Sequence, residues 1–178
     1  AHVQAEFGDS LLVLDGGPCE VGIESTIIDC TRGMPVLLRP GAITRVQVAA
    51  ACGQPVCSQQ ELDAQMPAAP RASGTLEAHY APSARVRLMD AAALQTALDL
   101  LGADAAGIAI WSRAVLRSRS SGIVRRRMPD DAAAAAQQLF AVLREFDAGA
   151  VSLIWVETPP DTPEWEGVRD RLQRASAA

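Results

Sequence analysis

Residues 84–111, ARVRLMDAAALQTALDLLGADAAGIAIW, carry the pattern that decides the fold class. Ala84 to Met89 has the pattern of a strand, and Ala91 to Leu101 has the pattern of a helix that Gly102 closes. Ala106 to Trp111 is a second apolar strand. A strand, a helix and a strand in this order predict a mainly parallel sheet with helices on its faces. We therefore assign this part of the chain to the α/β class.

The alternation continues to the C-terminus. We expect a short strand near Gly122 to Arg126, a long helix over Asp131 to Phe146 and an apolar strand over Ser152 to Glu157. A final helix is expected from Glu164 to about Ala175, with Thr162 as its cap and Pro163 in its first turn. Large apolar residues at periodic positions are interpreted as core or interdomain packing residues: Leu143, Phe146, Trp155 and Trp165.

The N-terminal part reads as short strands joined by glycine turns. Strands are predicted over Ser10 to Asp15, Gly22 to Cys30 and Pro35 to Arg39. Thr44 is placed to cap a short helix that runs through Ala51 and ends at Gly53. This part is therefore expected to be rich in sheet.

Between the two parts the chain loses periodicity and fills with Pro, Ala, Gln and Ser. This composition favours an extended connector, and a loop of such length is usually a linker or a functional lid. The predicted organisation is a first unit at 1–53, a linker at 54–83 and a second unit at 84–178.

The bulk properties limit the classes of function. The chain has 178 residues, 49% hydrophobic content, a formal charge of -5 and a pI near 5.0. These values predict a globular protein that does not coat nucleic acid or a membrane through net charge. No membrane span or signal peptide is evident, so a soluble cytoplasmic protein is expected. The four cysteines lack zinc-ligand spacing and are interpreted as buried or idle thiols.

The best candidates for chemistry are Glu24, Ser25 and Thr26, and the Arg39-Pro40-Gly41 turn. Arginine can fork onto phosphate oxygens, and serine and threonine hydroxyls can hydrogen-bond a small acid. A glycine after the arginine lets a ligand approach the backbone. The alternative is that Ser25 and Thr26 merely suit a strand and Arg39 pairs with a surface carboxylate. The residues alone leave both interpretations open.

Several ordered motifs together resemble one family. They are GGPCEVGIESTIIDC at 16–30, PVLLRPGAIT at 35–44, SGTLEAHYAP at 73–82, LFAVLREFD at 139–147, IWVETPP at 154–160 and EWEGVRDRLQRAS at 164–176. The chain is similar to threonylcarbamoyl-AMP synthases of the long, two-domain form. The resemblance extends over essentially the whole chain, which makes it far more specific than a single glycine-rich motif.

The resemblance implies part of a YrdC-like twisted-sheet domain followed by a smaller Rossmann-like parallel α/β domain. It implies a nucleotidyltransferase that uses L-threonine, bicarbonate and ATP, with magnesium on the phosphates, for threonylcarbamoyl-adenosine modification of tRNA. Ser25 matches the threonine-binding position and Arg39 the arginine that faces the ATP phosphates. Tyr80, with His79 beside it, matches the linker segment that reaches the ATP site. Glu24 and Thr26 are expected to be structural, and no side chain is assigned as a catalytic nucleophile or metal ligand.

The departures from the family limit the expected activity. A basic segment and a Ser-Ala-Asn motif that line the family's cavity do not occur in this sequence, and the chain starts at Ala1, which indicates a fragment. We expect a half-lined cavity, a partly uncovered N-terminal sheet and little synthase activity from this chain alone.

A different function is tied to the one basic cluster, which comprises Arg113, Arg117, Arg119, Arg125, Arg126 and Arg127. These side chains could contact tRNA phosphates or a tRNA-modification protein, or form a solvated surface. The alternative to the enzyme is thus a noncatalytic RNA-binding or interaction module derived from it.

Overall fold

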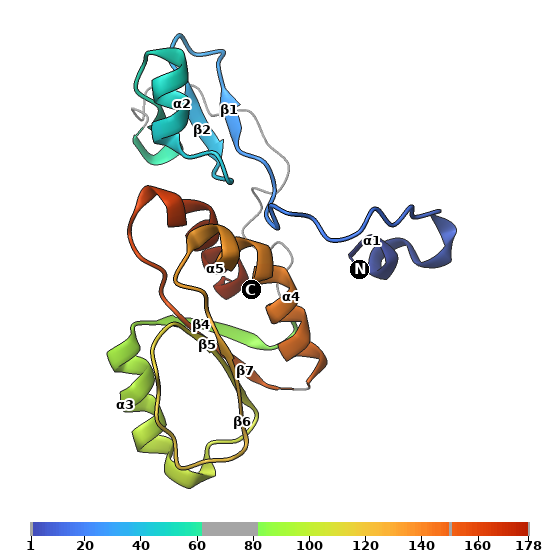
Figure 1. Ribbon diagram of the computed structural model, residues 1–178, viewed down its shortest axis with the longest axis vertical. Coiled ribbons are helices and arrows are strands. Elements are labelled where there is room, and N and C mark those ends of the chain that lie inside the picture. The colour runs from blue at the N-terminus through green and yellow to red at the C-terminus, as the bar shows by residue number, and fades with distance from the viewer. Residues whose placement is uncertain (1, 62–81, 150, 178) are drawn as a thin grey trace.

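The computed structural model describes residues 2–61, 82–149 and 151–177, and these residues form two separate sheets. The first sheet has the order β1-β2-β3 and the second the order β4-β7-β5-β6. Figure 1 shows the two sheets as separate layers, with the helices α4 (Ala132–Ala148) and α5 (Glu166–Ser176) between them. The mixed α/β class expected from the sequence is confirmed.

The small sheet is built around one hairpin. Strand β1 (Ile27–Asp29) pairs antiparallel with β2 (Val36–Arg39), so that Ile27 faces Arg39 at one end and Asp29 faces Val36 at the other. Strand β3 (Cys57–Ser58) adds parallel to β2. All four residues of β2 are buried, which is expected of a central strand.

The helix α2 (Arg45–Cys52) has the predicted ends. Thr44 and Gln47 form a capping box, in which the Thr44 hydroxyl accepts from the Gln47 amide and the Gln47 side chain accepts from the Thr44 amide. Gly53 ends the helix at a φ of 70°, a left-handed conformation that glycine adopts without strain. Both signals were visible in the sequence because capping depends on neighbouring residues only.

The strand predicted at Ser10 to Asp15 is wrong. Helix α1 (His2–Phe7) and the 3-10 turn η1 (Gly8–Ser10) precede an extended segment that pairs with no strand in the described part of the chain. Figure 1 shows this segment as an arm that leaves the two sheets, and Leu12 and Leu14 on it are 85% and 86% exposed. An apolar extended run becomes a strand only when a neighbour supplies hydrogen bonds, and the sequence does not reveal that neighbour.

The next two expectations need smaller corrections. The strand predicted from Gly22 to Cys30 is confined to β1, because Gly22 has a φ of 71° and begins an irregular approach to α4. The first residues of the predicted linker form β3 and the 3-10 turn η2 (Gln59–Glu61). The rest of that linker, residues 62–81, lies outside the described residues, and the domain boundaries stay a prediction.

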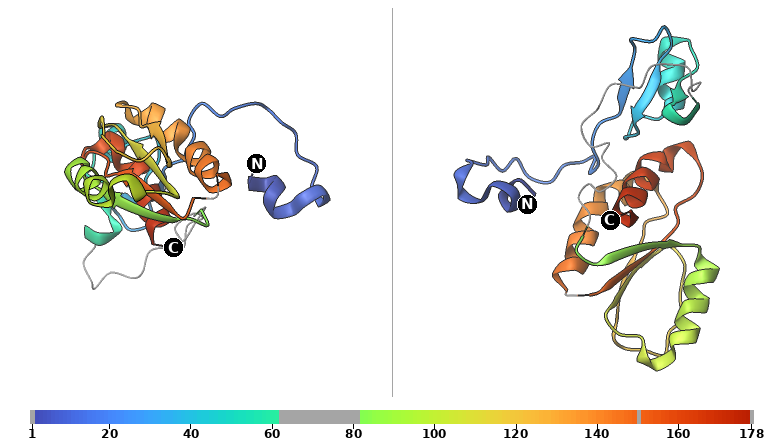
Figure 2. Two further views of the ribbon diagram at one scale, coloured as in Figure 1. Left: turned by 90° about the horizontal axis from the view of Figure 1, so that it is seen from below. Right: turned by 180° about the vertical axis from the view of Figure 1, so that it is seen from behind.

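The second sheet is entirely parallel and sandwiched between helices. Its strands are β4 (Arg85–Met89), β5 (Ile108–Ser112), β6 (Ile123–Arg127) and β7 (Leu153–Glu157), and β7 lies between β4 and β5. Helix α3 (Ala91–Leu101), followed by the 3-10 turn η3 (Gly102–Asp104), covers one face. Helices α4 and α5 cover the other face, as the two views in Figure 2 make clear.

Side chains of strand β5 pack on both faces of the second sheet. Ile108 and Ile110 pack with α3, whereas Ala109 and Trp111 pack with α4 and α5. All five residues of β5 are buried, since successive side chains on a strand point to opposite faces and both are covered. The continuous apolar run of the sequence therefore reflects a buried parallel strand.

The predicted elements of this second unit are confirmed to within a few residues. The four apolar residues assigned to packing are buried: Leu143, Phe146, Trp155 and Trp165. The last helix is preceded by the 3-10 turn η4 (Pro163–Trp165). Thr162 is the residue before η4, but its side chain makes no capping hydrogen bond, so that part of the prediction is wrong.

The two sheets are connected by tight packing as well as by the chain. Ile23 is 9% exposed and belongs to the core cluster that contains Trp165, Val168 and Leu172. A Cβ added to Gly22 would lie 2.2 Å from the Cα of Gln137 on α4. The segment that leads into β1 is thus docked against the helices of the second sheet.

Candidate functional site

Ser25 and Arg39, the two residues predicted to bind substrates, lie in contact. Arg39 ends β2 and Ser25 precedes β1, and the antiparallel pairing of the two strands brings them together. The Nε of Arg39 donates to the Ser25 carbonyl at 3.0 Å, and its Nη2 donates to the Ser25 hydroxyl at 3.3 Å. Arg39 is 7% exposed while Ser25 is exposed, so a buried cation is held beneath a hydroxyl that reaches the surface.

Gly41 has a different task from the one expected. A Cβ at this position would lie 2.4 Å from the Thr26 nitrogen and 2.6 Å from the Glu24 carbonyl oxygen. The close approach that glycine permits is therefore made by the chain's own backbone at residues 24–26. Gly41 thus allows the chain after β2 to pack directly against the backbone that precedes β1.

Glu24 and Thr26, on either side of Ser25, make structural contacts. The Thr26 hydroxyl donates to the Ile43 carbonyl at 2.7 Å, and the Glu24 carboxylate accepts from Arg171 Nε on α5 at 2.7 Å. Burial alone would raise the pKa of Glu24, but the hydrogen bond from Arg171 and the positive charges of Arg171 and Arg39 outweigh it and lower the pKa. Glu24 therefore remains a carboxylate at neutral pH.

His79 and Tyr80, predicted to reach the ATP site, lie outside the described residues. The four cysteines carry free thiols, of which Cys19, Cys30 and Cys52 are exposed and Cys57 is half-buried. Of the expected buried or idle thiols, burial is thus excluded, and the idle role stays a prediction. In residues 2–61, 82–149 and 151–177, His, Cys, Asp and Glu form no group of three that could hold a metal ion. No helix in these ranges is both long and apolar enough to cross a bilayer.

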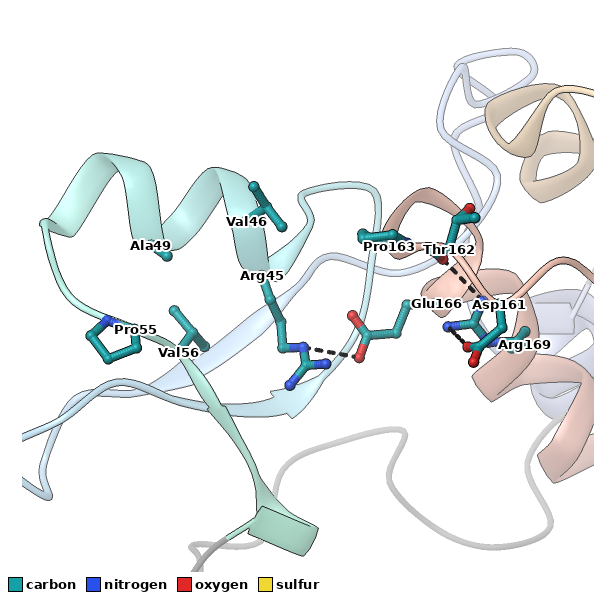
Figure 3. Close-up of a pocket in the computed structure, with 10 residues that line it drawn as sticks. All are labelled: Arg45, Val46, Ala49, Pro55, Val56, Asp161, Thr162, Pro163, Glu166 and Arg169. Carbon is teal, nitrogen blue, oxygen red and sulfur yellow. Dashed lines mark hydrogen bonds and ion pairs between the residues drawn. The ribbon is translucent and has the colours of Figure 1, made fainter.

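A pocket of about 410 Å³ lies between α2 and the beginning of α5 (Figure 3). Arg45 and Glu166 point toward each other across it, with Nε and Oε1 3.3 Å apart. On its far side Arg169 pairs with Asp161 at 3.2 Å and donates to the Thr162 carbonyl at 2.9 Å. Within this pocket the Arg45–Glu166 pair joins α2 to α5, whereas the contacts of Arg169 remain within the second unit.

Glu157 gathers a polar cluster at the carboxyl end of the second sheet, where open α/β sheets commonly bind ligands. Its carboxylate accepts from the Ser112 hydroxyl at 2.7 Å, the Arg113 amide at 2.8 Å and the Ala114 amide at 2.9 Å. Burial would raise its pKa, but these hydrogen bonds and the charge of Arg113 lower it. The Glu157 carboxylate thus occupies the hydrogen-bond donors that an anionic ligand would use at this position.

Three of the six arginines of the basic cluster lie on the edge strand β6, and each has a local partner. Arg126 pairs with Glu145 at 2.5 Å and Arg127 with Asp130 at 2.8 Å. Arg125 donates to the Leu116 carbonyl at 3.0 Å. Exposed ion pairs of this kind contribute little to stability. The cluster is therefore a surface feature with local partners.

Sequence reasoning missed the contacts that join distant segments. Glu24 and Arg171 are separated by 147 residues, and Ser112 and Glu157 by 45. Each is an ordinary charged or polar residue in its local sequence, and the IWVETPP motif was the only signal near Glu157. These contacts could be found only after the strands and helices were placed.

Residues 43–177 match the family model of the threonylcarbamoyl-AMP synthase C-terminal domain. The chain belongs to the threonylcarbamoyl-AMP synthase family. Ser25 and Arg39 precede the matched range, so their assignment depends on the resemblance of their own motifs and on their contact.

Three relatives extend the similarity to the whole chain. Threonylcarbamoyl-AMP synthase of Bacillus subtilis (strain 168) is 31% identical over 177 residues, covering 92% of this chain and 48% of that protein. The Schizosaccharomyces pombe enzyme is 28% identical, covering 99% and 48%. The crystal structure of Pyrococcus abyssi Sua5 complexed with L-threonine superposes with a TM-score of 0.78 at 25% identity, covering 98% of this chain and 52% of that one. The chain spans about half the length of these family members.

Proposed function

We propose that this chain forms part of an enzyme that condenses L-threonine, bicarbonate and ATP into threonylcarbamoyl-AMP, with release of pyrophosphate and water. The product would serve the threonylcarbamoyl-adenosine modification of tRNA, and the enzyme would act in the cytoplasm. The observation that carries the proposal is the buried Arg39 guanidinium held against Ser25 at the end of β2. Family membership and the L-threonine bound by the P. abyssi relative support it.

Ser25 and Arg39 have complementary roles in this proposal. A hydroxyl has one donor and two acceptor lone pairs, so Ser25 can accept from Arg39 and still donate to the carboxylate of threonine. The guanidinium group of arginine carries a delocalised positive charge. Arg39 lies in a site of low exposure, where this group can neutralise the phosphates of ATP. The contact between them orients both groups before substrates bind, which lowers the entropic cost of binding.

The chemistry needs positioning and charge neutralisation more than a side-chain nucleophile. An oxygen of the threonine carbamate attacks the α-phosphorus of ATP, the bond to the β-phosphate oxygen breaks and pyrophosphate leaves. The family resemblance assigns Tyr80 and His79 to the ATP site, where exclusion of water would protect a reactive mixed anhydride.

Magnesium bound together with ATP would neutralise negative charge on the phosphates. Among the described residues, His, Cys, Asp and Glu form no group of three that could hold it. Glu24, the carboxylate next to Ser25, is held by Arg171. None of the steps assigned to Ser25 and Arg39 depends on the metal.

Titration with ATP tests the assignment of Arg39. Loss of a hydrogen bond to a charged group costs about 1.5–3 kcal/mol, so Arg39→Ala is expected to weaken ATP binding by roughly tenfold to a hundredfold. Arg32→Ala is the matched control, because Arg32 is a half-buried arginine in the turn of the same hairpin and pairs with Asp29, at the opposite end from Arg39. Equal binding of ATP by Arg39→Ala and the unmodified chain would contradict the assignment.

Pyrophosphate release tests whether this chain, which spans about half the length of its relatives, is active by itself. Because this chain spans about half the length of its relatives, we expect it to bind ligands but to turn over little. Robust ATP- and threonine-dependent release by the chain alone would refute that expectation.

The RNA-binding alternative predicts that tRNA affinity depends on Arg125, Arg126 and Arg127. Neutralising all three with glutamine should leave tRNA binding unchanged under the enzyme proposal, since two of them are already engaged with carboxylates. A large loss of tRNA affinity would favour the noncatalytic module.

A further inference from the structure

A partly buried ion pair connects the last helix to the segment that carries Ser25. Arg171 Nε on α5 donates to Glu24 Oε2 at 2.7 Å, and the two side chains are 4% and 25% exposed. Glu24 directly precedes Ser25 in the chain. The second unit therefore contacts the residue next to Ser25 in the chain.

Arg171 is itself held in place by its own helix. Its Nη1 donates to Asp170 Oδ2 at 2.5 Å, and Asp170 also accepts from Arg174 Nη2 at 2.9 Å. The Nη2 of Arg171 is buried with no hydrogen-bond partner among the described residues. A buried pair with a donor left unsatisfied contributes little net stability, because desolvation offsets the attraction. What this pair does supply is a fixed position for Glu24.

The backbone around the ion pair leaves no space for adjustment. A Cβ added to Gly167, one turn before Arg171, would lie 2.7 Å from Ile23 Cδ1 and 3.1 Å from the Gly41 carbonyl oxygen. A Cβ added to Gly41 would meet residues 24–26 on its other side. Helix α5, Gly41 and residues 23–26 thus form a continuous close-packed stack, and a displacement of α5 must move the backbone of Ser25.

We propose that Arg171 is a positioning residue for the Ser25–Arg39 site. By holding Glu24 it fixes the backbone of residues 24–26, and hence the carbonyl and hydroxyl of Ser25 to which Arg39 donates. The inference rests on the proposed function, since it takes this site to bind ATP and L-threonine. The second unit then contributes to substrate binding without touching either substrate.

The test compares Arg171→Gln and Glu24→Gln with the unmodified chain. Arg169→Gln is the matched control, because Arg169 lies on the same helix and pairs with the exposed Asp161. The first measurement is solvent exchange of the Arg39 Nε–H by nitrogen-15 NMR, which reports the hydrogen bond to the Ser25 carbonyl. The second is the dissociation constant of ATP and of L-threonine by calorimetry.

We expect the Arg39 Nε–H to exchange at least tenfold faster in Arg171→Gln and Glu24→Gln, and both ligands to bind at least fivefold more weakly. Amides of β5 and β7 should exchange as before. Arg169→Gln should change neither measurement by more than about twofold, because its carboxylate partner Asp161 is fully exposed. Arg171→Lys, which keeps the charge, should restore part of the binding.

Unchanged exchange at Arg39 in a folded Arg171→Gln would overturn the inference. So would faster exchange that is equal at Arg39 and at the β5 and β7 amides, because Arg171 would then stabilise the fold as a whole. If Arg171→Gln fails to fold, the nearly isosteric Glu24→Gln decides by the same criteria. An unmodified chain that binds neither ligand, with Arg39 still released in the variants, would refute the proposed function and support the positioning contact.

Discussion

Replacing Gly41 with alanine tests whether the site is built on close backbone contact. The added Cβ would lie 2.4 Å from the Thr26 nitrogen, 2.6 Å from the Glu24 carbonyl oxygen and 2.8 Å from the Ser25 carbonyl carbon. These are backbone atoms that cannot rotate away, and reaching an ordinary contact distance requires a retreat of about 1 Å. Overpacking of this kind costs typically 1–3 kcal/mol, and the absence of a flexible neighbour places Gly41→Ala near about 3 kcal/mol.

Urea denaturation measures this loss directly. With a slope of about 2 kcal/mol/M for a chain of this size, the midpoint should fall by roughly 1.5 M. Gly16→Ala is the control, because its added Cβ meets no heavy atom within 4 Å, and it should stay within about 0.5 kcal/mol of the unmodified chain. A Gly41→Ala variant as stable as Gly16→Ala would refute the reasoning, because the backbone would then accommodate the added Cβ despite the short distances.

Three further perturbations address the hairpin, the core and a helix end. Hydrogen bonds from the Thr31 hydroxyl and amide, together with Arg32, lower the pKa of Asp29 from 3.8 to about 2. The stability that the Asp29 carboxylate contributes is therefore present above about pH 4 and is lost as the pH falls toward 2. Urea midpoints measured from pH 5 to pH 2 should fall less steeply for Asp29→Asn; parallel curves would contradict this. Leu172→Ala removes a fully buried core side chain and should lower the free energy of unfolding by about 2–5 kcal/mol, whereas a loss below about 1 kcal/mol would mean that the site refills. Asp131→Ala removes the cap that accepts from the Ala134 amide and should cost about 1 kcal/mol in the same assay, and an unchanged midpoint would show that the cap is dispensable.

The second sheet was predicted well because its signals are local. The apolar runs at β5 and β7, the helical spacing of α4 and the glycine after α3 each depend on residues within a few positions. Helix α2 was predicted for the same reason, through Thr44 and Gly53. Where an element needs a partner from elsewhere, as at Ser10 to Asp15, the apolar pattern alone predicted a strand that does not form.

The candidate site divides in the same way. Ser25 and Arg39 could be singled out because their types suit a small acid and a nucleotide and their motifs resemble a family. The sequence did not predict the hydrogen bonds between Ser25 and Arg39. Nor did it predict the close contact of Gly41 with residues 24–26 or the hydrogen bond from Arg171 to Glu24. Each depends on which strands pair and on which helix packs beneath them.

The sequence by itself therefore determined the α/β class, the order of the elements and the family to which the chain belongs. These follow from periodicity, capping and ordered motifs, all of which are written along the chain. The tertiary structure alone decided that residues 23–26 dock into the core of the second sheet and that a carboxylate and an arginine 147 positions apart meet beside Ser25. Contacts between distant residues depend on the packing of whole elements, and ordinary Glu, Arg and Gly residues carry no local mark of the partner they will meet.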